Sequence, residues 1–373
     1  MSLNIDLHIL QTVPPSNLNR DDSGSPKSAQ YGGVRRARVS SQAWKRATRA
    51  DFSRRLSPNQ VGVRTLRAAE LLAERVVTLD PSVDPAAAAK LAEQALGAVG
   101  LKLESRRKKK DAPDEEDPGV KTEYLVFFSN EQLDRLAELA LTGEKTARAY
   151  KAIMQGNNGV DLALFGRMVA NDADLNVDAS VQVAHALSTH AVDNEFDFYT
   201  AVDDKAPKEE TGAGMMGTIE FNSSVLYRYA TLNVDLLAAQ LGEPSDAVRA
   251  VAEFVRSFIE SMPTGKQNTF ANGTLPDAVV VSARSDRGVS YVGAFERPVR
   301  AGRDGGYLQN SAAALTDYAK DVVAQYASPA GETWVLRVGS ATDSLDALGG
   351  TRVTLPQLTD AVCGAVSEHL GLA

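Results

Sequence analysis

The sequence predicts an α+β fold, in which a sheet and a block of helices occupy different stretches of the chain. Alternating apolar and polar residues, typical of strands, occur near the start and return after residue 177. Residues 61–176 are mostly helical in pattern. Strands and helices do not alternate regularly, which argues against a βα-repeat architecture. Because the helical block interrupts the strands, we expect it to be an insertion.

The strand predictions rest on a two-residue period. In residues 3–10, Leu3, Ile5, Leu7 and Ile9 alternate with polar residues, which predicts a strand with one buried face. Further strands are expected at residues 177–183, 218–234, 279–283 and 290–294.

The helix predictions rest on capping residues and on helical spacing. Ser40 or Ser41 can cap a helix that runs to about Arg55. At about 100° per residue, one face of this helix carries Gln42, Lys45, Arg46 and Arg49. Ala43, Ala47 and Ala50 lie on another side, where close packing is expected. Further helices are expected at residues 66–77, 86–101, 131–141, 147–154, 247–262, 311–326 and 355–370.

Three polar segments are expected to be loops. Residues 11–33 are rich in Pro, Ser, Asn, Asp and Gly and predict a long loop, which in a compact protein is often functional. Residues 106–117 carry a mixed-charge run typical of a solvated, mobile loop. Residues 203–217 end in Gly-Met-Met-Gly and predict a protruding hairpin or flexible arm.

Charge is distributed unevenly along the chain. The net charge is -8, but residues 20–55 hold ten basic and three acidic residues. The rest of the chain holds 30 basic and 45 acidic residues, a net charge of -15. A basic patch on an acidic body is typical of a protein that binds a polyanion, while the acidic remainder discourages indiscriminate coating of nucleic acid.

Signatures of catalysis and of metal binding are mostly missing. Cys363 is the only cysteine, so neither an intrachain disulfide nor a cysteine-based zinc site is expected. His185 and His190 are five residues apart, a poor spacing for a shared metal. No Walker loop, H-E-x-x-H or G-x-S-x-G sequence is present. We therefore expect a non-enzymatic protein without cofactor or metal.

The N-terminal residues and the hydropathy predict a cytoplasmic protein. The first eight residues lack the basic start and apolar run of a secretory signal. No apolar stretch is long enough to span a bilayer, so no membrane partner is expected.

The basic helix face favours binding to a nucleic-acid backbone. Its side chains can line one phosphodiester track, and the Ser40 and Ser41 hydroxyls with the helix N-terminal amides also suit phosphate. The alternative is an ordinary solvated helix face. Apolar candidates for contacts with bases are Met168, Met215, Met216, Phe196, Phe198 and Tyr199. At least two of the three aromatic residues are expected to be buried, because aromatics at strand spacing usually belong to a core.

Seven stretches in collinear order form a recognisable set. They are residues 16–22 (SNLNRDD), 31–42 (YGGVRRARVSSQ), 161–168 (DLALFGRM), 184–190 (AHALSTH), 197–204 (DFYTAVDD), 227–230 (YRYA) and 263–267 (PTGKQ). Together they resemble the CasC family, the backbone subunits of type I-E CRISPR Cascade complexes. The last 80 residues or so resemble the family least.

The resemblance implies a modified RRM-like (ferredoxin-like) palm with a helical fingers insertion and a β-hairpin thumb. The implied boundaries are palm 1–59, fingers 60–180, palm 181–199, thumb 200–223 and palm 224–373. It also implies that several copies stack head to tail along one guide RNA, and that the thumb displaces a base at regular intervals. Target DNA would then pair with the guide in short segments.

The resemblance also implies which residues contact the guide. Its backbone would be held by Arg20, Lys27, Ser40, Gln42, Lys45, Arg46 and Arg49. Arg167 and Met168 would lie near the displaced base, Lys266, Gln267 and Asn268 would form a palm loop near the RNA, and Met215 and Met216 would form a thumb wedge. Implied partners are crRNA, target DNA, further copies of the chain, the large, small, 5′-end cap and repeat-processing subunits of Cascade, and a recruited helicase-nuclease.

Two other functions remain open at this level. Related backbone subunits of other CRISPR types cut RNA with one acidic residue, and Asp21, Asp22, Asp203 and Asp204 are available here. The basic patch also suits an interaction module with an acidic protein partner.

Overall fold

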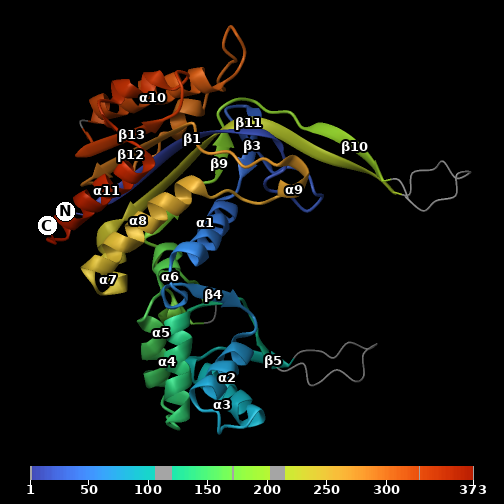
Figure 1. Cartoon of the computed structure of the whole chain (residues 1–373), viewed down its shortest axis with the longest axis vertical. Helices are drawn as coiled ribbons and strands as arrows, with labels where there is room; N and C mark the ends of the chain where they lie inside the picture. Colours follow the sequence, from blue (N-terminus) through green and yellow to red (C-terminus); the bar gives the residue numbers. More distant parts are fainter. Residues whose placement is uncertain (1, 106–119, 170–171, 202–214, 327, 373) are drawn as a thin grey trace, which may run out of the picture. The chain divides into compact units, whose positions relative to one another are not determined.

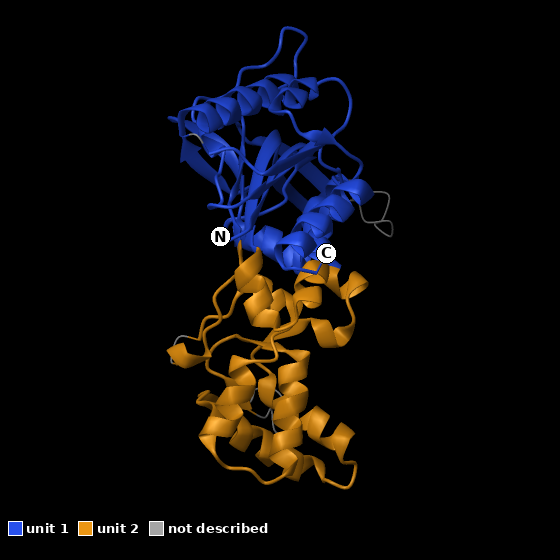
Figure 2. Ribbon diagram, turned by 90° about the vertical axis from the view of Figure 1, so that its left-hand side faces the viewer, with its two compact units in different colours: residues 1–51, 182–233, 251–373 blue, residues 52–181, 234–250 orange. Residues whose placement is uncertain are grey.

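The computed structural model describes residues 2–105, 120–169, 172–201, 215–326 and 328–372. The chain forms two compact units (Figure 2). Unit 1 comprises residues 1–51, 182–233 and 251–373, and unit 2 comprises residues 52–181 and 234–250. Unit 2 thus includes residues 234–250, a segment that the implied boundaries place in the palm.

Unit 1 is built on a mixed α/β arrangement with a central sheet. The strand order is β14-β13-β12-β1-β11-β9-β3-β2, and β10 and β8 also pair with β11. The strands are β1 (Asn4–Ser16), β2 (Ser28–Tyr31), β3 (Val34–Val39), β8 (Val181–Val183), β9 (Ala186–Ser188), β10 (Glu195–Ala201), β11 (Met215–Asn233), β12 (Ala278–Arg284), β13 (Glu332–Arg337) and β14 (Thr351–Arg352).

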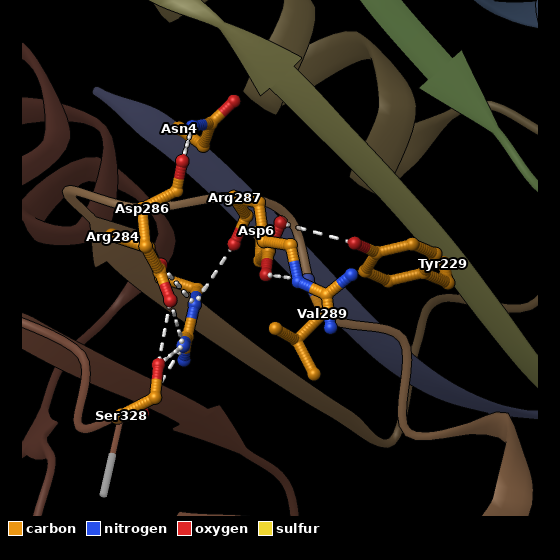
Figure 3. A network of polar contacts seen from close by, with 8 residues as sticks. All are labelled: Asn4, Asp6, Tyr229, Arg284, Asp286, Arg287, Val289 and Ser328. Carbon is orange, nitrogen blue, oxygen red and sulfur yellow. Dashed lines mark hydrogen bonds and ion pairs between the residues drawn. The ribbon is translucent and has the colours of Figure 1, made fainter. Parts of the chain in front are cut away.

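Strand β1 is the centre of this sheet, and its prediction needs one correction. It pairs antiparallel with both β11 and β12, and its residues 4–11 are buried on both faces, not on one. The polar face is buried because its side chains hydrogen-bond to neighbouring strands and loops. Asp6 accepts the hydroxyl of Tyr229 at 3.1 Å and the N–H of Val289 at 2.8 Å (Figure 3).

The buried carboxylate of Asp6 predicts a pH-dependent stability. Burial raises the pKa of Asp6 from 3.8 to about 6. Because the folded-state pKa is the higher one, protonation of Asp6 stabilises the folded chain. This stabilisation is complete below the unfolded-state pKa and is lost as the pH rises through the folded-state pKa. Relative to Asp6→Asn, the wild-type chain should lose about 2 kcal/mol of unfolding free energy between pH 4 and pH 7.

Urea unfolding of both proteins across this pH range measures the difference. A wild-type advantage or deficit that stays constant with pH would contradict the role assigned to Asp6.

Three other strand and loop predictions are wrong at their boundaries or in type. The long loop predicted at residues 11–33 is reduced to residues 17–27, because β1 continues to Ser16 beside β11 and β2 begins at Ser28. Of residues 177–183, only β8 is a strand. Residues 290–294 form part of a 3-10 turn (η3, Val292–Phe295) instead of a strand.

The predicted helices are present, each within three residues of its expected ends. Unit 1 contains α9 (Gln267–Phe270), α10 (Leu308–Tyr326) and α11 (Leu355–His369), with η4 (Asp343–Leu348). Two helices, α1 (Ser41–Arg55) and α8 (Pro244–Glu260), each continue from one unit into the other. Among the described residues, no helix has the length and apolar content needed to cross a bilayer.

Unit 2 packs short helices around its own apolar core. Leu72, Leu96, Leu133 and Leu136 are fully buried in it. Its helices are α2 (Ala68–Leu79), α3 (Pro85–Val99), α4 (Asn130–Leu141), α5 (Ala147–Gln155), α6 (Val160–Phe165) and α7 (Val234–Leu241), with η1 (Pro58–Gln60) and η2 (Ala173–Leu175). Its strand pairs are β4 (Gly62–Thr65) with β7 (Val126–Ser129) and β5 (Leu103–Ser105) with β6 (Val120–Thr122). The charged run predicted at residues 106–117 lies outside the described residues.

Helix α1 confirms its prediction but packs on a different face. Ser40 caps it, because its Oγ accepts the N–H of Ala43 at 3.3 Å. The buried face carries Trp44, Thr48 and Phe52, whereas the alanines expected to pack are half-buried or exposed. Large aromatic side chains remove far more apolar surface from water than alanines do, so they determine which face is buried.

Candidate nucleic-acid interface

The loop of residues 17–27 is held firmly against the sheet of unit 1. The side-chain amide of Asn17 donates to the carbonyl oxygen of Gly24 at 2.9 Å, within the loop. It also donates to the carbonyl oxygen of Glu220, on β11, at 3.0 Å. These bonds give a long polar connection a defined conformation.

Asn19 connects this loop to the start of α1. Its carbonyl oxygen accepts the N–H of Lys27 at 2.8 Å, and its Oδ1 accepts the N–H of Ser40 at 2.9 Å. Arg20 is exposed and Lys27 is half-buried. Two predicted RNA-binding cations therefore lie next to the capped end of the predicted RNA-binding helix.

The N-terminus of α1 has a second contact that the sequence did not suggest. The N–H of Ser41 donates to Nδ1 of His185 at 3.2 Å, so this ring nitrogen carries no proton. Partial burial, with the positive charges of Arg38 and Lys27, lowers the pKa of His185. An exposed neutral histidine therefore lies among cations at a helix end that favours anions.

The predicted basic face of α1 is accessible. Gln42 and Arg46 are exposed, and Lys45 and Arg49 are half-buried. Ser40 is 6% exposed and uses its hydroxyl in the cap, so it orders the helix end and offers little surface of its own. One of the ten basic residues of the 20–55 window, Arg36, is fully buried and donates to the carbonyl oxygens of Ser188 and Phe295, both at 2.8 Å.

Gly265 brings a third segment to the same loop. A Cβ at this position would lie 2.2 Å from the carbonyl oxygen of Leu18 and 2.6 Å from that of Asn17, so only glycine allows the approach. Lys266 follows in a left-handed conformation with φ of 51°, and α9 then starts at Gln267. Lys266 is half-buried, and Gln267 and Asn268 are exposed.

A small hollow lies between the loop, β3 and β11. Its polar lining consists of Ser16, Asn19, Lys27, Arg38, Asn222 and Ser224, and the lining includes no carboxylate. Cations and neutral hydrogen-bonding groups without an acid are a lining that suits phosphate and ribose oxygens. The structure thus brings together nine predicted residues on three connected segments of unit 1: Arg20, Lys27, Gln42, Lys45, Arg46, Arg49, Lys266, Gln267 and Asn268.

Arg167 does not fit the predicted role near a displaced base. It is 4% exposed, and its guanidinium donates to the carbonyl oxygens of Leu175 at 2.8 Å, Phe127 at 3.2 Å and Met154 at 2.6 Å. A fourth bond reaches Oε1 of Gln132 at 3.0 Å. The side chain connects segments inside unit 2, and it has no free surface for a nucleic acid.

Met168, the next residue, is 81% exposed. It lines an apolar hollow of about 270 Å³ in unit 2, together with Tyr124 and Leu125. These two side chains are 50% and 58% exposed, so the hollow is open to an apolar or aromatic group.

A two-stranded ribbon, β10–β11, extends beyond the sheet (Figure 1). Most of the arm predicted at residues 203–217, namely residues 203–214, lies outside the described residues, as does the side chain of Met215. Phe196, Phe198 and Tyr199 on β10 are 67%, 63% and 39% exposed, so the expectation that at least two of them are buried is wrong. The reason is that, within the part of the chain that the structure describes, β10 pairs only with β11. Met216 is 64% exposed.

Asp21, one of the acidic residues considered for catalysis, has a structural use. Oδ1 of Asp21 accepts the N–H groups of Ser23 and Ser25, both at 3.0 Å, and the hydroxyl of Ser23 at 2.7 Å. These bonds lower its pKa and stabilise the loop. Asp203 and Asp204 lie outside the described residues. The described residues contain no group of three or more His, Cys, Asp or Glu arranged to hold a metal.

Sequence reasoning missed His185 and Arg38 as members of the interface. Only the fold brings His185, which directly precedes β9, to the N-terminus of α1. Arg38 lies on β3, where strand alternation does not reveal that a half-buried arginine lines a hollow.

Comparisons with known proteins found similar chains over nearly the whole sequence. A chain of a structure described as "CRISPR RNA-guided surveillance complex, pre-nicking" is 36% identical, with a TM-score of 0.85, and the match covers 97% of this chain and 100% of that one. A chain of a "CRISPR RNA-guided surveillance complex" is 31% identical, with a TM-score of 0.63, covering 97% and 99%. A search of curated proteins gave no match. Residues 5–361 match the CT1975-like protein family, and the chain therefore belongs to this family.

Proposed function

We propose that this protein is the non-catalytic, guide-RNA-binding backbone subunit of a type I-E CRISPR Cascade complex. The observation that carries the proposal is the connected basic surface of unit 1, formed by the 17–27 loop, α1 and the segment around Lys266. Similarity to chains of RNA-guided surveillance complexes supports it. A role in the cytoplasm follows from this assignment.

The proposed binding mode is a grip on the guide backbone. Arg20, Lys27, Lys45, Arg46 and Arg49 pair with phosphates, because they are cations on an accessible surface. Neutral hydrogen-bonding groups suit phosphate and 2′-hydroxyl oxygens, and these are supplied by Gln42, Gln267 and Asn268, next to Lys266. Such contacts leave base edges free to pair with target DNA and carry little sequence preference.

Within this proposal the sheet of unit 1 is an RRM-like palm, unit 2 provides the fingers and the β10–β11 ribbon is the base of the thumb. Copies of the chain stack head to tail, a heterologous contact that produces an open helix. The exposed Met168, beside its apolar hollow, contacts the displaced base. Further proposed partners are target DNA, the other Cascade subunits and the recruited helicase-nuclease.

The thumb assignment predicts a separation of assembly from target recognition. Met215→Gly with Met216→Gly should leave binding of the guide RNA unchanged, because neither residue lies on the basic surface. It should alter pairing with target DNA, since the wedge between segments is lost. Electrophoretic mobility of assembled particles with labelled target measures both steps.

A matched control is Leu275→Gly, which removes another exposed apolar side chain (69% exposed) from a loop of unit 1. If target binding of the double variant equals that of this control, the two methionines have no wedge role.

The assignment itself is tested by co-expression with a repeat-spacer transcript and the neighbouring subunits. Native mass spectrometry of the purified particle, with sizing of its RNA, should find several copies on one intact guide of defined length. Particles that lack RNA would favour the acidic-partner module, and shortened RNA that becomes intact in Asp21→Asn or Asp22→Asn variants would favour a nuclease.

A further inference from the structure

Arg228, on β11, is buried beneath α1. It is 1% exposed, and its guanidinium carbon lies 3.8 Å from the ring centroid of Trp44 and 4.7 Å from that of Phe258. One terminal nitrogen donates to Oε1 of Gln11 at 2.7 Å, and the other donates to the carbonyl oxygen of Phe258. The cation is thus enclosed between two aromatic side chains.

Among the described residues, this buried charge has no acidic partner. Its contacts there are to neutral groups, and its Nε has no hydrogen-bond acceptor among them. Arg284, an equally buried arginine on β12, differs because it pairs with Asp286 at 3.1 Å (Figure 3). Burial lowers the pKa of Arg228 to about 9, so the side chain still carries its charge at neutral pH.

Burying a charge without a counter-ion costs free energy, so a gain in folding stability does not explain why Arg228 is buried. Its position suggests a different reason. Trp44, the side chain on which Arg228 stacks, is itself 1% exposed and belongs to the packed face of α1. The next residue, Lys45, lies on the accessible basic face of α1. Trp44 and the basic side chains belong to one helix, so a change in the Trp44 contact would turn the basic face as well.

We propose that Arg228 is a positioning residue for the nucleic-acid interface. It fixes the rotation of α1 through Trp44, and it adds an unpaired positive charge behind the helix that carries Lys45, Arg46 and Arg49. This inference rests on the proposed function. At an effective dielectric constant of about 20, a charge about 10 Å from a phosphate still attracts it appreciably.

Two substitutions separate the two contributions. Arg228→Met keeps an unbranched side chain between the aromatic rings and removes the charge. We expect about fivefold weaker binding of single-stranded RNA with an unchanged salt slope, because no phosphate contact is lost. Arg228→Ala also removes the packing. It should weaken binding about 50-fold and lower the slope, because the basic face turns away from the strand.

Arg228→Lys keeps the positive charge and should bind RNA with most of the wild-type affinity. A role in apolar packing alone would not depend on that charge. The control is Arg284→Met, which removes a buried but paired arginine from the same unit and should bind RNA like the wild type. Circular dichroism and thermal unfolding establish that each variant is folded. RNA affinity of Arg228→Ala and Arg228→Met equal to the wild type would overturn the role of Arg228 alone. A wild-type chain that binds no RNA would overturn the proposed function and this inference together.

Discussion

Replacing Lys45 and Arg49 by alanine should weaken RNA binding by about 10- to 100-fold at low salt, for all RNA sequences alike. Both side chains lie on the basic face of α1, and each is proposed to contact a phosphate. Losing a phosphate contact on a single strand lowers the slope of log K against log salt by about 0.7. The double variant should therefore show a slope smaller by about 1.4.

Fluorescence anisotropy of labelled RNAs of different sequence, over a series of salt concentrations, measures affinity and slope together. The control is Lys90→Ala with Lys320→Ala, which removes two exposed lysines from α3 and α10 and changes the net charge equally. A loss restricted to particular RNA sequences would mean that α1 reads bases, contrary to the proposal.

Gly265→Ala should have a comparable effect although it removes no charge. The added methyl group would lie 2.2 Å from the carbonyl oxygen of Leu18, and such an overlap with backbone forces one of the two segments to move. Moving the segment displaces Lys266 from the loop that carries Arg20. We expect about tenfold weaker RNA binding, with only a small change in melting temperature, because an exposed loop contributes little to the core.

Gly273→Ala is a close control, because nothing lies within 4 Å of a Cβ at Gly273, only eight residues along the chain. Comparing the RNA affinity of the two variants separates the clash from the general effect of alanine on a flexible backbone. Equal affinities would show that the contact between the two segments is not needed for binding.

The sequence predicted the helices of this fold better than its sheet. Helix α1 could be placed from Ser40 and the spacing of Lys45 and Arg49, because capping and a 3.6-residue period are local properties. The buried polar face of β1 could not be foreseen. Asp6 is buried only because Tyr229 and Val289, more than 200 residues away, supply its hydrogen bonds.

The residues of the interface that share one helix could be predicted from the sequence. Those whose position depends on tertiary contacts could not. Gln42, Lys45, Arg46 and Arg49 share one helix face, so their grouping could be read from spacing. Arg167 looked like a ligand-binding cation, yet its partners are carbonyl groups whose direction no sequence pattern encodes. The exposed aromatics of β10 were misjudged because strand spacing does not reveal that β10 has a single neighbouring strand.

The central place of β1 has a consequence for the biogenesis of the protein. This strand is synthesised well before its two neighbours in the sheet, since β11 and β12 begin more than 200 residues after the start of β1. Pairing over such separations is slow because a long loop must close first. During translation both edges of β1 therefore remain unpaired until these strands have been made. In that period the segment is prone to aggregation. The central pairing of the sheet in unit 1, and the proposed RNA-binding surface that depends on it, form only once the ribosome has passed residue 284.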